Sequence, residues 1–365
     1  MMRKQLTMAL MAIALTVNAQ DKPAKWYDNF KFSGYGMLQY QGQDPEGNSS
    51  NTFNLRLARF ILDGKIGDFD WRAQIQGTNV KGPGEPTVQL VDLYAEWRKH
   101  PEFKVRAGQF KRAFTFENPT HPITQGWRGY ADVINKLSAF GDRTGEKSSG
   151  GRDIGIQFAG DISAGSGSSR RPIFHYQLGI YNGEGVNQKD MDNRKDIISG
   201  IWFMPVKGVR VGAFGWTGSR GGMLDKNTGE KISIEKNRYC LSAEYDLNEY
   251  TFRAEYIHSQ GWGAASPGNN VREIDYSKGD KADGWYVFGI VPVVKSKLHA
   301  KARYQVYRNT KEWSSSVNQI ECGLNYHFTK NLELHLEYSH VNDRSIADPD
   351  KHNYNLVDAE IDFRF

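Results

Sequence analysis

Apolar and polar residues alternate along most of the chain from Phe30 onward. In Leu332–Ser339 every second residue is apolar and the residues between are charged or polar, and Val357–Phe365 repeats this pattern. A period of two is typical of a β-strand with one apolar and one polar face. The pattern predicts about sixteen strands, at residues 30–41, 52–65, 71–78, 87–98, 103–111, 153–160, 173–181, 197–204, 209–217, 237–246, 250–259, 284–291, 297–307, 316–328, 332–340 and 355–365.

The connections between these strands alternate between short and long. Short links stand at residues 67–69, 205–208, 247–249 and 329–331, and long polar links lie between them, at residues 181–196, 218–236 and 260–283. Outer-membrane barrels have short periplasmic turns and long external loops in this order. The spacing therefore predicts a transmembrane antiparallel β-barrel, and the terminal Phe365 on an alternating strand is typical of such barrels.

The alternative is a soluble β-sandwich or propeller, whose strands also alternate. The polar face of this chain is too charged to form the core of such a protein, because it carries Arg253, Glu255, Lys301, Arg303, Glu333, Glu337, Asp358, Glu360 and Asp362. These side chains need water, so the apolar face must meet lipid. We therefore expect an all-β barrel with a water-filled lumen.

The first twenty residues differ from the rest of the chain. A basic start at Arg3 and Lys4 precedes an apolar run that ends in Val17-Asn18-Ala19, and a polar segment follows at once. This arrangement is typical of a cleavable secretion signal, with an anchoring helix as the alternative. We expect a signal peptide at residues 1–20, a barrel domain at residues 21–365 and export to the bacterial outer membrane.

Composition and motifs argue against an enzyme. The chain has 47 basic and 42 acidic residues, a net charge of +5, which predicts no nucleic-acid partner. The histidines stand alone, as at His258, His299 and His335, and we find no Ser/His/Asp grouping, CxxC pair or EF-hand pattern. We expect no cofactor and no metal, and a barrel enzyme or adhesin remains an alternative.

The longest stretch outside the strands, residues 111–152, is a probable constriction loop. A loop of this length in an otherwise economical barrel is usually functional. Seven basic residues against four acidic ones give it a net charge of +3, which favours anions. The alternative is a solvated surface loop.

Strand parity separates the expected lumen charges into two walls. The second to fifth strands direct Arg56, Arg59, Arg72, Arg98, Lys104 and Arg106 inward, with a bulge between Leu57 and Arg59 that aims both Arg56 and Arg59 at the lumen. The last three strands direct acidic residues inward: Glu321, Glu333, Glu337, Asp358, Glu360 and Asp362. Arginine suits anions, and phosphate in particular, whereas the acidic wall opposes a simple anion funnel.

Several motifs resemble the phosphate-selective porin O and P family. They are Arg56–Gly67, Leu93–Trp97, Val105–Phe114, Gly151–Gln157, Leu178–Gly185 and Gly323–Phe328, and together they extend over the mature chain. The resemblance implies a sixteen-stranded, trimeric porin for small anions such as phosphate, in contact with outer-membrane lipid. It places Arg59, Arg106 and Lys111 at the constriction.

The expected channel-lining, anion-binding set combines the motifs with strand parity. It comprises Arg56, Arg59, Arg72, Arg98, Lys104, Arg106, Lys111 and Arg112. The functional alternative is a general, weakly selective diffusion porin for small polar solutes.

Overall fold

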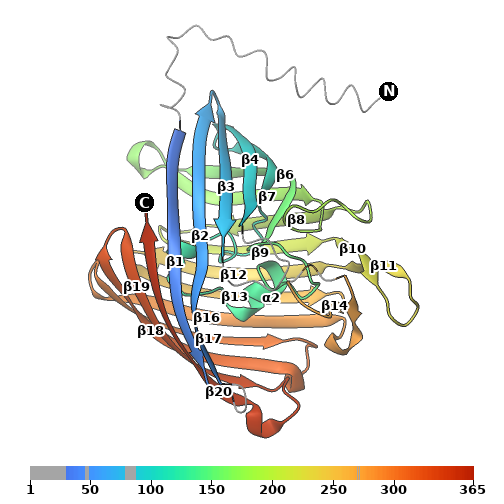
Figure 1. The fold of residues 1–365 in the computed structure, drawn as a ribbon. Helices are drawn as coiled ribbons and strands as arrows, with labels where there is room; N and C mark the ends of the chain where they lie inside the picture. Colours follow the sequence, from blue (N-terminus) through green and yellow to red (C-terminus); the bar gives the residue numbers. More distant parts are fainter. Residues whose placement is uncertain (1–29, 46–48, 79–87, 269, 271) are drawn as a thin grey trace, which may run out of the picture.

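A computed structural model describes residues 30–45, 49–78, 88–268, 270 and 272–365. The predicted signal peptide lies outside the described residues. Within them, sixteen strands form a closed barrel in which each strand pairs antiparallel with the next and β20 returns to β1 (Figure 1). The prediction of a sixteen-stranded antiparallel barrel is confirmed.

The barrel strands follow the predicted segments closely. They are β1 (Phe30–Gln43), β2 (Ser50–Ile66), β3 (Phe69–Gly77), β4 (Val88–His100), β5 (Phe103–Lys111), β6 (Arg152–Ala164), β7 (Arg171–Tyr181), β8 (Asp196–Phe203), β9 (Val209–Thr217), β12 (Asn237–Leu247), β13 (Tyr250–Gln260), β16 (Lys281–Val294), β17 (Leu298–Arg308), β18 (Ser316–Thr329), β19 (Leu332–Asp343) and β20 (Asn353–Arg364).

Shorter elements lie in the connections. The long loops contain two small hairpins, β10 (Ser219–Leu224) with β11 (Lys231–Glu235) and β14 (Gly263–Ala264) with β15 (Ile274–Asp275), which the alternation did not predict. The helical turns are η2 (Pro122–Thr124), α2 (Asp132–Ser138), η3 (Gly167–Ser169), η4 (Tyr276–Lys278), η5 (Trp313–Ser315) and η6 (Pro349–Lys351). None of the helices in the described ranges has the length and apolar character needed to cross a membrane.

The burial of the barrel side chains is the reverse of that in a water-soluble protein. On β19, Leu336 is 45% exposed on the outside, whereas the neighbouring Glu337 is 4% exposed on the inside. Apolar residues that face outward can be solvated by lipid, and the closed ladder leaves no strand edge to lose hydrogen bonds there. The polar face therefore lines the lumen, as the alternation predicted.

Phe365 joins the last strand to the first. Its backbone N–H donates to the carbonyl of Gly34 at 3.0 Å, and its own carbonyl accepts from the Gly34 N–H at 2.9 Å. Its ring packs against Phe32 and Phe60 on the outer face. Glycine is needed at position 34, since a Cβ there would lie 2.4 Å from the Phe365 ring.

A bulge sits in β2 next to the predicted position. Met37 pairs with Leu57 and Leu38 pairs with Leu55, which leaves Arg56 without an opposing residue. Arg56 and Arg59 consequently both reach the lumen side, where they contact Glu360 and Gln76. The predicted bulge, which turns Arg56 and Arg59 to the same side, is confirmed, but it lies slightly earlier in the strand than predicted.

Candidate functional site

Residues 112–151, here called the inner loop, pack inside the barrel (Figure 1). One side of the loop is apolar and buries residues such as Phe114, Phe116 and Trp127. They pack against inward side chains of the filled half, defined as strands β7–β9, β12, β13 and β16, which supply Tyr181, Ile198, Phe214, Trp216, Ile257, Tyr286 and Phe288. Burial of this apolar area holds the loop against one side of the lumen.

Barrel side chains also hold the backbone of the inner loop. The Glu255 carboxylate on β13 accepts hydrogen bonds from the Phe116 N–H (2.5 Å), the Glu117 N–H (3.2 Å), the Ser242 hydroxyl (2.6 Å) and the Tyr286 hydroxyl (2.7 Å). Backbone groups buried without partners are costly. Glu255 therefore supplies the hydrogen-bond acceptors for the loop backbone where the loop turns away from β5.

A buried ion network anchors the ends of the loop. Arg112 pairs with Glu146, and Lys236 bridges Glu146 (3.0 Å) to Asp196 (2.7 Å). Arg152, at the far end of the loop, forms a bidentate pair with Asp92 at 2.7 and 2.9 Å. Loss of one partner from such a buried pair leaves an uncompensated charge. The loop thus has a fixed position at both ends.

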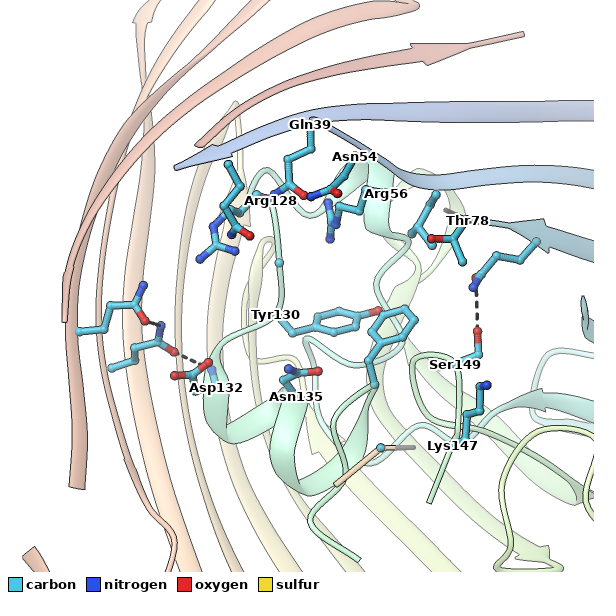
Figure 2. A pocket seen from close by; sticks show the side chains of 18 of the residues that line it. Gln39, Asn54, Arg56, Thr78, Arg128, Tyr130, Asp132, Asn135, Lys147 and Ser149 are labelled. Atoms are coloured by element: carbon cyan, nitrogen blue, oxygen red, sulfur yellow. Dashed lines mark hydrogen bonds between the residues drawn. The ribbon is translucent and has the colours of Figure 1, made fainter. Parts of the chain in front are cut away.

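A cavity of about 650 Å³ lies on the other side of the inner loop (Figure 2). We call this side the open half, formed by β1–β4 and β17–β20. The lining combines side chains of the barrel and of the loop: Gln39, Gln41, Asn54, Arg56, Leu57, Gln76, Thr78, Gln89, Arg128, Gly129, Tyr130, Asp132, Asn135, Phe140, Lys147, Ser149, Gly268, Arg303, Gln305 and Gln319.

The charges at the cavity are arranged in two layers. Arg56 is 18% exposed and lies 2.8 Å from Glu360, which is 1% exposed. Arg128 is 21% exposed and lies 2.8 Å from Asp358, which is 2% exposed. Arg303 also borders the cavity, but it is only 2% exposed and is paired with the buried Glu321. Arg56 and Arg128 therefore face the cavity with their carboxylate partners on β20 behind them, while Asp132 is a carboxylate of the loop that lines the cavity itself.

Four of the eight predicted residues lie toward the short-turn end of the lumen. Arg72, Arg98 and Arg106 line a second cavity of about 560 Å³. Each is paired there, Arg72 with Asp63, Arg98 with Asp70 and Arg106 with Glu96. Lys104 is paired with Asp161 at 2.6 Å. Of the predicted set, only Arg56 lines the larger cavity.

The other three predicted residues, Arg59, Lys111 and Arg112, are enclosed by protein. Arg59 donates to the Gln76 carboxamide at 2.5 and 2.9 Å. Lys111 donates to the carbonyls of Asn118 and Thr120, both at 2.9 Å, and to the Tyr130 hydroxyl. They do not line the larger cavity, because the inner loop covers them.

This buried basic cluster affects a histidine of the inner loop. Burial, followed by the charges of Arg59, Lys111 and Arg152, lowers the pKa of His121 to about 3. His121 is therefore neutral at physiological pH and adds no charge to the lumen. Within the described ranges, no group of three or more His, Cys, Asp or Glu side chains could hold a metal ion.

Arg128 and the carboxamides of the cavity were missed by the sequence analysis. The alternation of side chains along β1, β17 and β18 could have identified Gln39, Gln305 and Gln319 as inward residues. The predicted lining was instead restricted to charged side chains. Arg128 was one of several loop cations, and no periodic pattern shows which of them face the open half.

Known proteins share both the sequence pattern and the architecture. The family described as phosphate-selective porin O and P matches residues 32–254. Among curated proteins, no sequence matches this chain.

Several solved porin structures are similar in fold. The anion-selective porin from Comamonas acidovorans has a TM-score of 0.63 at 12% identity, over 92% of this chain and 99% of that one. OmpF of Salmonella typhi, in complex with daunomycin, has a TM-score of 0.65 at 13% identity, over 92% and 98% of the two chains. A trimer form of OmpT from Vibrio cholerae has a TM-score of 0.58 at 13% identity, over 93% and 100%.

The identities to these structures are low, so the likeness extends to the barrel architecture alone. The family match is broader evidence, because it spans more than half of the chain and includes β1–β9, the inner loop, β12 and the start of β13. The chain belongs to the phosphate-selective porin O and P family.

Proposed function

We propose that this protein is an outer-membrane porin for passive diffusion of small anions such as phosphate. The observation that carries the proposal is the two-layer arrangement at the cavity. Arg56 and Arg128 face the passage, and their carboxylate partners, Glu360 and Asp358, are buried behind them. A passing ion therefore meets guanidinium groups first.

The pairing also explains why such a channel would release its solute. Arginine donates two parallel hydrogen bonds to phosphate or carboxylate. A channel must bind weakly enough to let the ion leave, and the carboxylates behind the arginines reduce the attraction. We expect a moderate anion preference rather than tight binding.

The predicted cations would act at different depths. Arg56 lines the cavity, while Arg72, Arg98, Lys104 and Arg106 would guide anions at the short-turn end. Arg59, Lys111 and Arg112 would contribute through the field of buried charge and by holding the inner loop, which we propose as the constriction.

A second candidate is a general, weakly selective porin for small polar solutes. The favouring observation is the number of carboxamides in the cavity: Gln39, Gln41, Asn54, Gln76, Gln89, Asn135, Gln305 and Gln319. Carboxamides donate and accept hydrogen bonds without selecting a charge. Neutral solutes would then pass as readily as anions.

Location and assembly follow from the same proposal. A signal peptide at residues 1–20 would direct export, the apolar outer face would contact outer-membrane lipid, and three copies would assemble. The OmpT trimer form supports this assembly by analogy. Multi-angle light scattering on the purified protein should give a trimer mass; a monomer mass would contradict it. We propose no catalytic activity.

Ion selectivity tests the proposed function. Purified protein in a planar bilayer under a potassium chloride gradient should show a reversal potential on the anion side, and added phosphate should reduce the chloride current. Equal permeability to potassium and chloride without phosphate block would favour the general porin.

A further inference from the structure

The cavity beside the inner loop is large for a single inorganic anion. Its volume of about 650 Å³ falls in the range of about 300–1,000 Å³ that is usual for pockets holding drug-sized molecules. Inorganic phosphate would leave most of this space to water. The volume of the cavity therefore favours a solute larger than inorganic phosphate.

Two cations that could bind an acidic group, Arg56 and Arg128, lie at the same end of the cavity, while Lys147 lies at the other end (Figure 2). Glu360 and Asp358, which hold Arg56 and Arg128, stand two residues apart on β20 and face the same side. Gln39 donates to Asp358 at 2.8 Å and lies beside these arginines. One acidic group of a solute could therefore contact both guanidinium groups.

The remaining lining suits hydroxyl groups. Gln319 is 5% exposed, its carboxamide oxygen accepts from Gln305 at 3.0 Å, and its Nε2 has no hydrogen-bond partner among the described residues. Across the described chain, Gln41 and Asn54 also form no side-chain hydrogen bond, and both line the cavity. A buried donor without a partner is costly, and a solute hydroxyl could accept from it.

An aromatic side chain completes the cavity. Phe140 is half-buried, lines the cavity and stacks on Tyr130 with ring centroids 5.9 Å apart and an interplanar angle of 25°. Its position is fixed by this stacking. An aromatic ring held in this way offers a flat apolar surface, which can cover the C–H face of a ring-shaped polyol.

We propose that the preferred solute of this cavity is an acidic sugar, such as a sugar phosphate or a uronate. Its acidic group lies between Arg56 and Arg128, its hydroxyl groups contact Gln319, Gln41 and Asn54, and Phe140 covers one face of its ring. The inference rests on the proposed anion channel and specifies the solute class for the same passage.

Current block in a planar bilayer tests the inference. Inorganic phosphate, glucose 6-phosphate and neutral glucose are added separately to the wild-type channel, and the half-blocking concentration of each is measured. Glucose 6-phosphate should block at a concentration at least about tenfold lower than phosphate, because two or more added hydrogen bonds contribute about 1 kcal/mol each. Glucose should block less well than glucose 6-phosphate, since it lacks the charged group.

Variants assign the effect to the carboxamides. Gln319→Leu and, separately, Asn54→Ala should remove most of the advantage of glucose 6-phosphate over phosphate. Gln74→Leu is the matched control, because Gln74 is also buried and has no side-chain partner among the described residues, but it does not line the cavity. Asn54 is the second variant because it is only half-buried and its replacement should leave folding intact.

The outcomes separate this inference from the proposed function. Equal block by phosphate and glucose 6-phosphate, in a channel that prefers anions, would overturn the sugar assignment and leave the anion channel standing. Block by glucose as strong as by glucose 6-phosphate would also overturn it, because the arginines would have no role. A channel without anion preference would contradict the proposed function itself.

Discussion

In both halves of the barrel, side chains alternate between the lumen and the outer face, but the side chains that face the lumen differ in chemistry. In the filled half, inward positions carry aromatic residues such as Phe214 and Trp216 on β9 and Tyr286 and Phe288 on β16, and the inner loop packs on them. In the open half, inward positions carry amides and arginines that face the cavity, with buried carboxylates behind the arginines. The inward face of a barrel can therefore hold a protein core on one side and a polar passage on the other.

This difference changes the interpretation of the acidic wall. From the sequence, the carboxylates of β18–β20 oppose an anion channel. In the structure, two of them, Glu360 and Asp358, lie behind Arg56 and Arg128, so they position cations that line the cavity. The sign of charge on a strand is thus a poor guide to the charge that a solute meets.

The largest expected effect comes from removing a cation that belongs to the core rather than to the cavity. Arg112→Met leaves Glu146 and Asp153 without this buried partner, which should cost about 3–5 kcal/mol of stability. Thermal unfolding followed by circular dichroism should show a clearly lower Tm. Arg170→Met is the control, because Arg170 and Glu102 form an exposed pair that contributes less than about 1 kcal/mol. Equal effects of the two substitutions would break the distinction between core and surface cations.

A somewhat smaller effect should follow from releasing the loop backbone. Glu255→Leu leaves the Phe116 and Glu117 N–H groups and the Tyr286 hydroxyl without their acceptor, a loss of about 3 kcal/mol at about 1 kcal/mol each. The Ser242 hydroxyl also loses Glu255 but keeps its contact with Cys240 Sγ. Single-channel recordings should show larger conductance and new current fluctuations as the inner loop detaches. Glu230→Leu, in an exposed loop, should leave the trace unchanged, and quiet recordings from Glu255→Leu would contradict the anchoring role.

A pH effect should be smaller still over any single pH unit. Burial raises the pKa of Glu117 on the inner loop from 4.5 to about 7, while Arg303 and Arg253 oppose the shift and Glu255 adds to it. Between these two values the folded protein holds a proton that the unfolded chain has lost, so stability falls as pH rises from about 4.5 to 7 and then levels off. The contribution should be about 1.4 kcal/mol for each pH unit, and about 3 kcal/mol over the whole range.

The measurement for Glu117 is the Tm at several pH values in the wild type and in Glu117→Gln. The substitution keeps a neutral side chain at all pH values, so its Tm should fall less over this range. Parallel curves for the two proteins would show that another group is responsible.

Most of the fold can be predicted from the sequence, but less of the candidate site can. Strand number, order and faces follow from a period of two, because each residue on a barrel strand faces either lipid or lumen. The bulge in β2 was also predictable, since Arg56 and Arg59 stand three residues apart and cannot both face the lumen in a regular strand. The inward aromatic residues of β9 and β16 were a further signal, which indicates that something apolar packs inside the barrel.

The path of the inner loop could not be predicted in this way. Which loop cations face the cavity depends on contacts between distant segments, as between Arg128 and Asp358 on β20. The burial of Lys111 and Arg112 likewise depends on Tyr130 and Glu146, which return to them through the loop. Such contacts between distant segments leave no periodic pattern in the sequence.

We propose that the cations facing the cavity set the preference for anions. The most direct test is the reversal potential of the wild type and of Arg56→Gln/Arg128→Gln under the same potassium chloride gradient. Arg170→Gln/Arg171→Gln, which removes two charges near the η3 turn between β6 and β7, is the matched control. We expect the wild-type reversal potential to lie on the anion side. It should move toward the cation side in Arg56→Gln/Arg128→Gln and stay unchanged in the control. An unchanged potential in Arg56→Gln/Arg128→Gln would contradict this proposal.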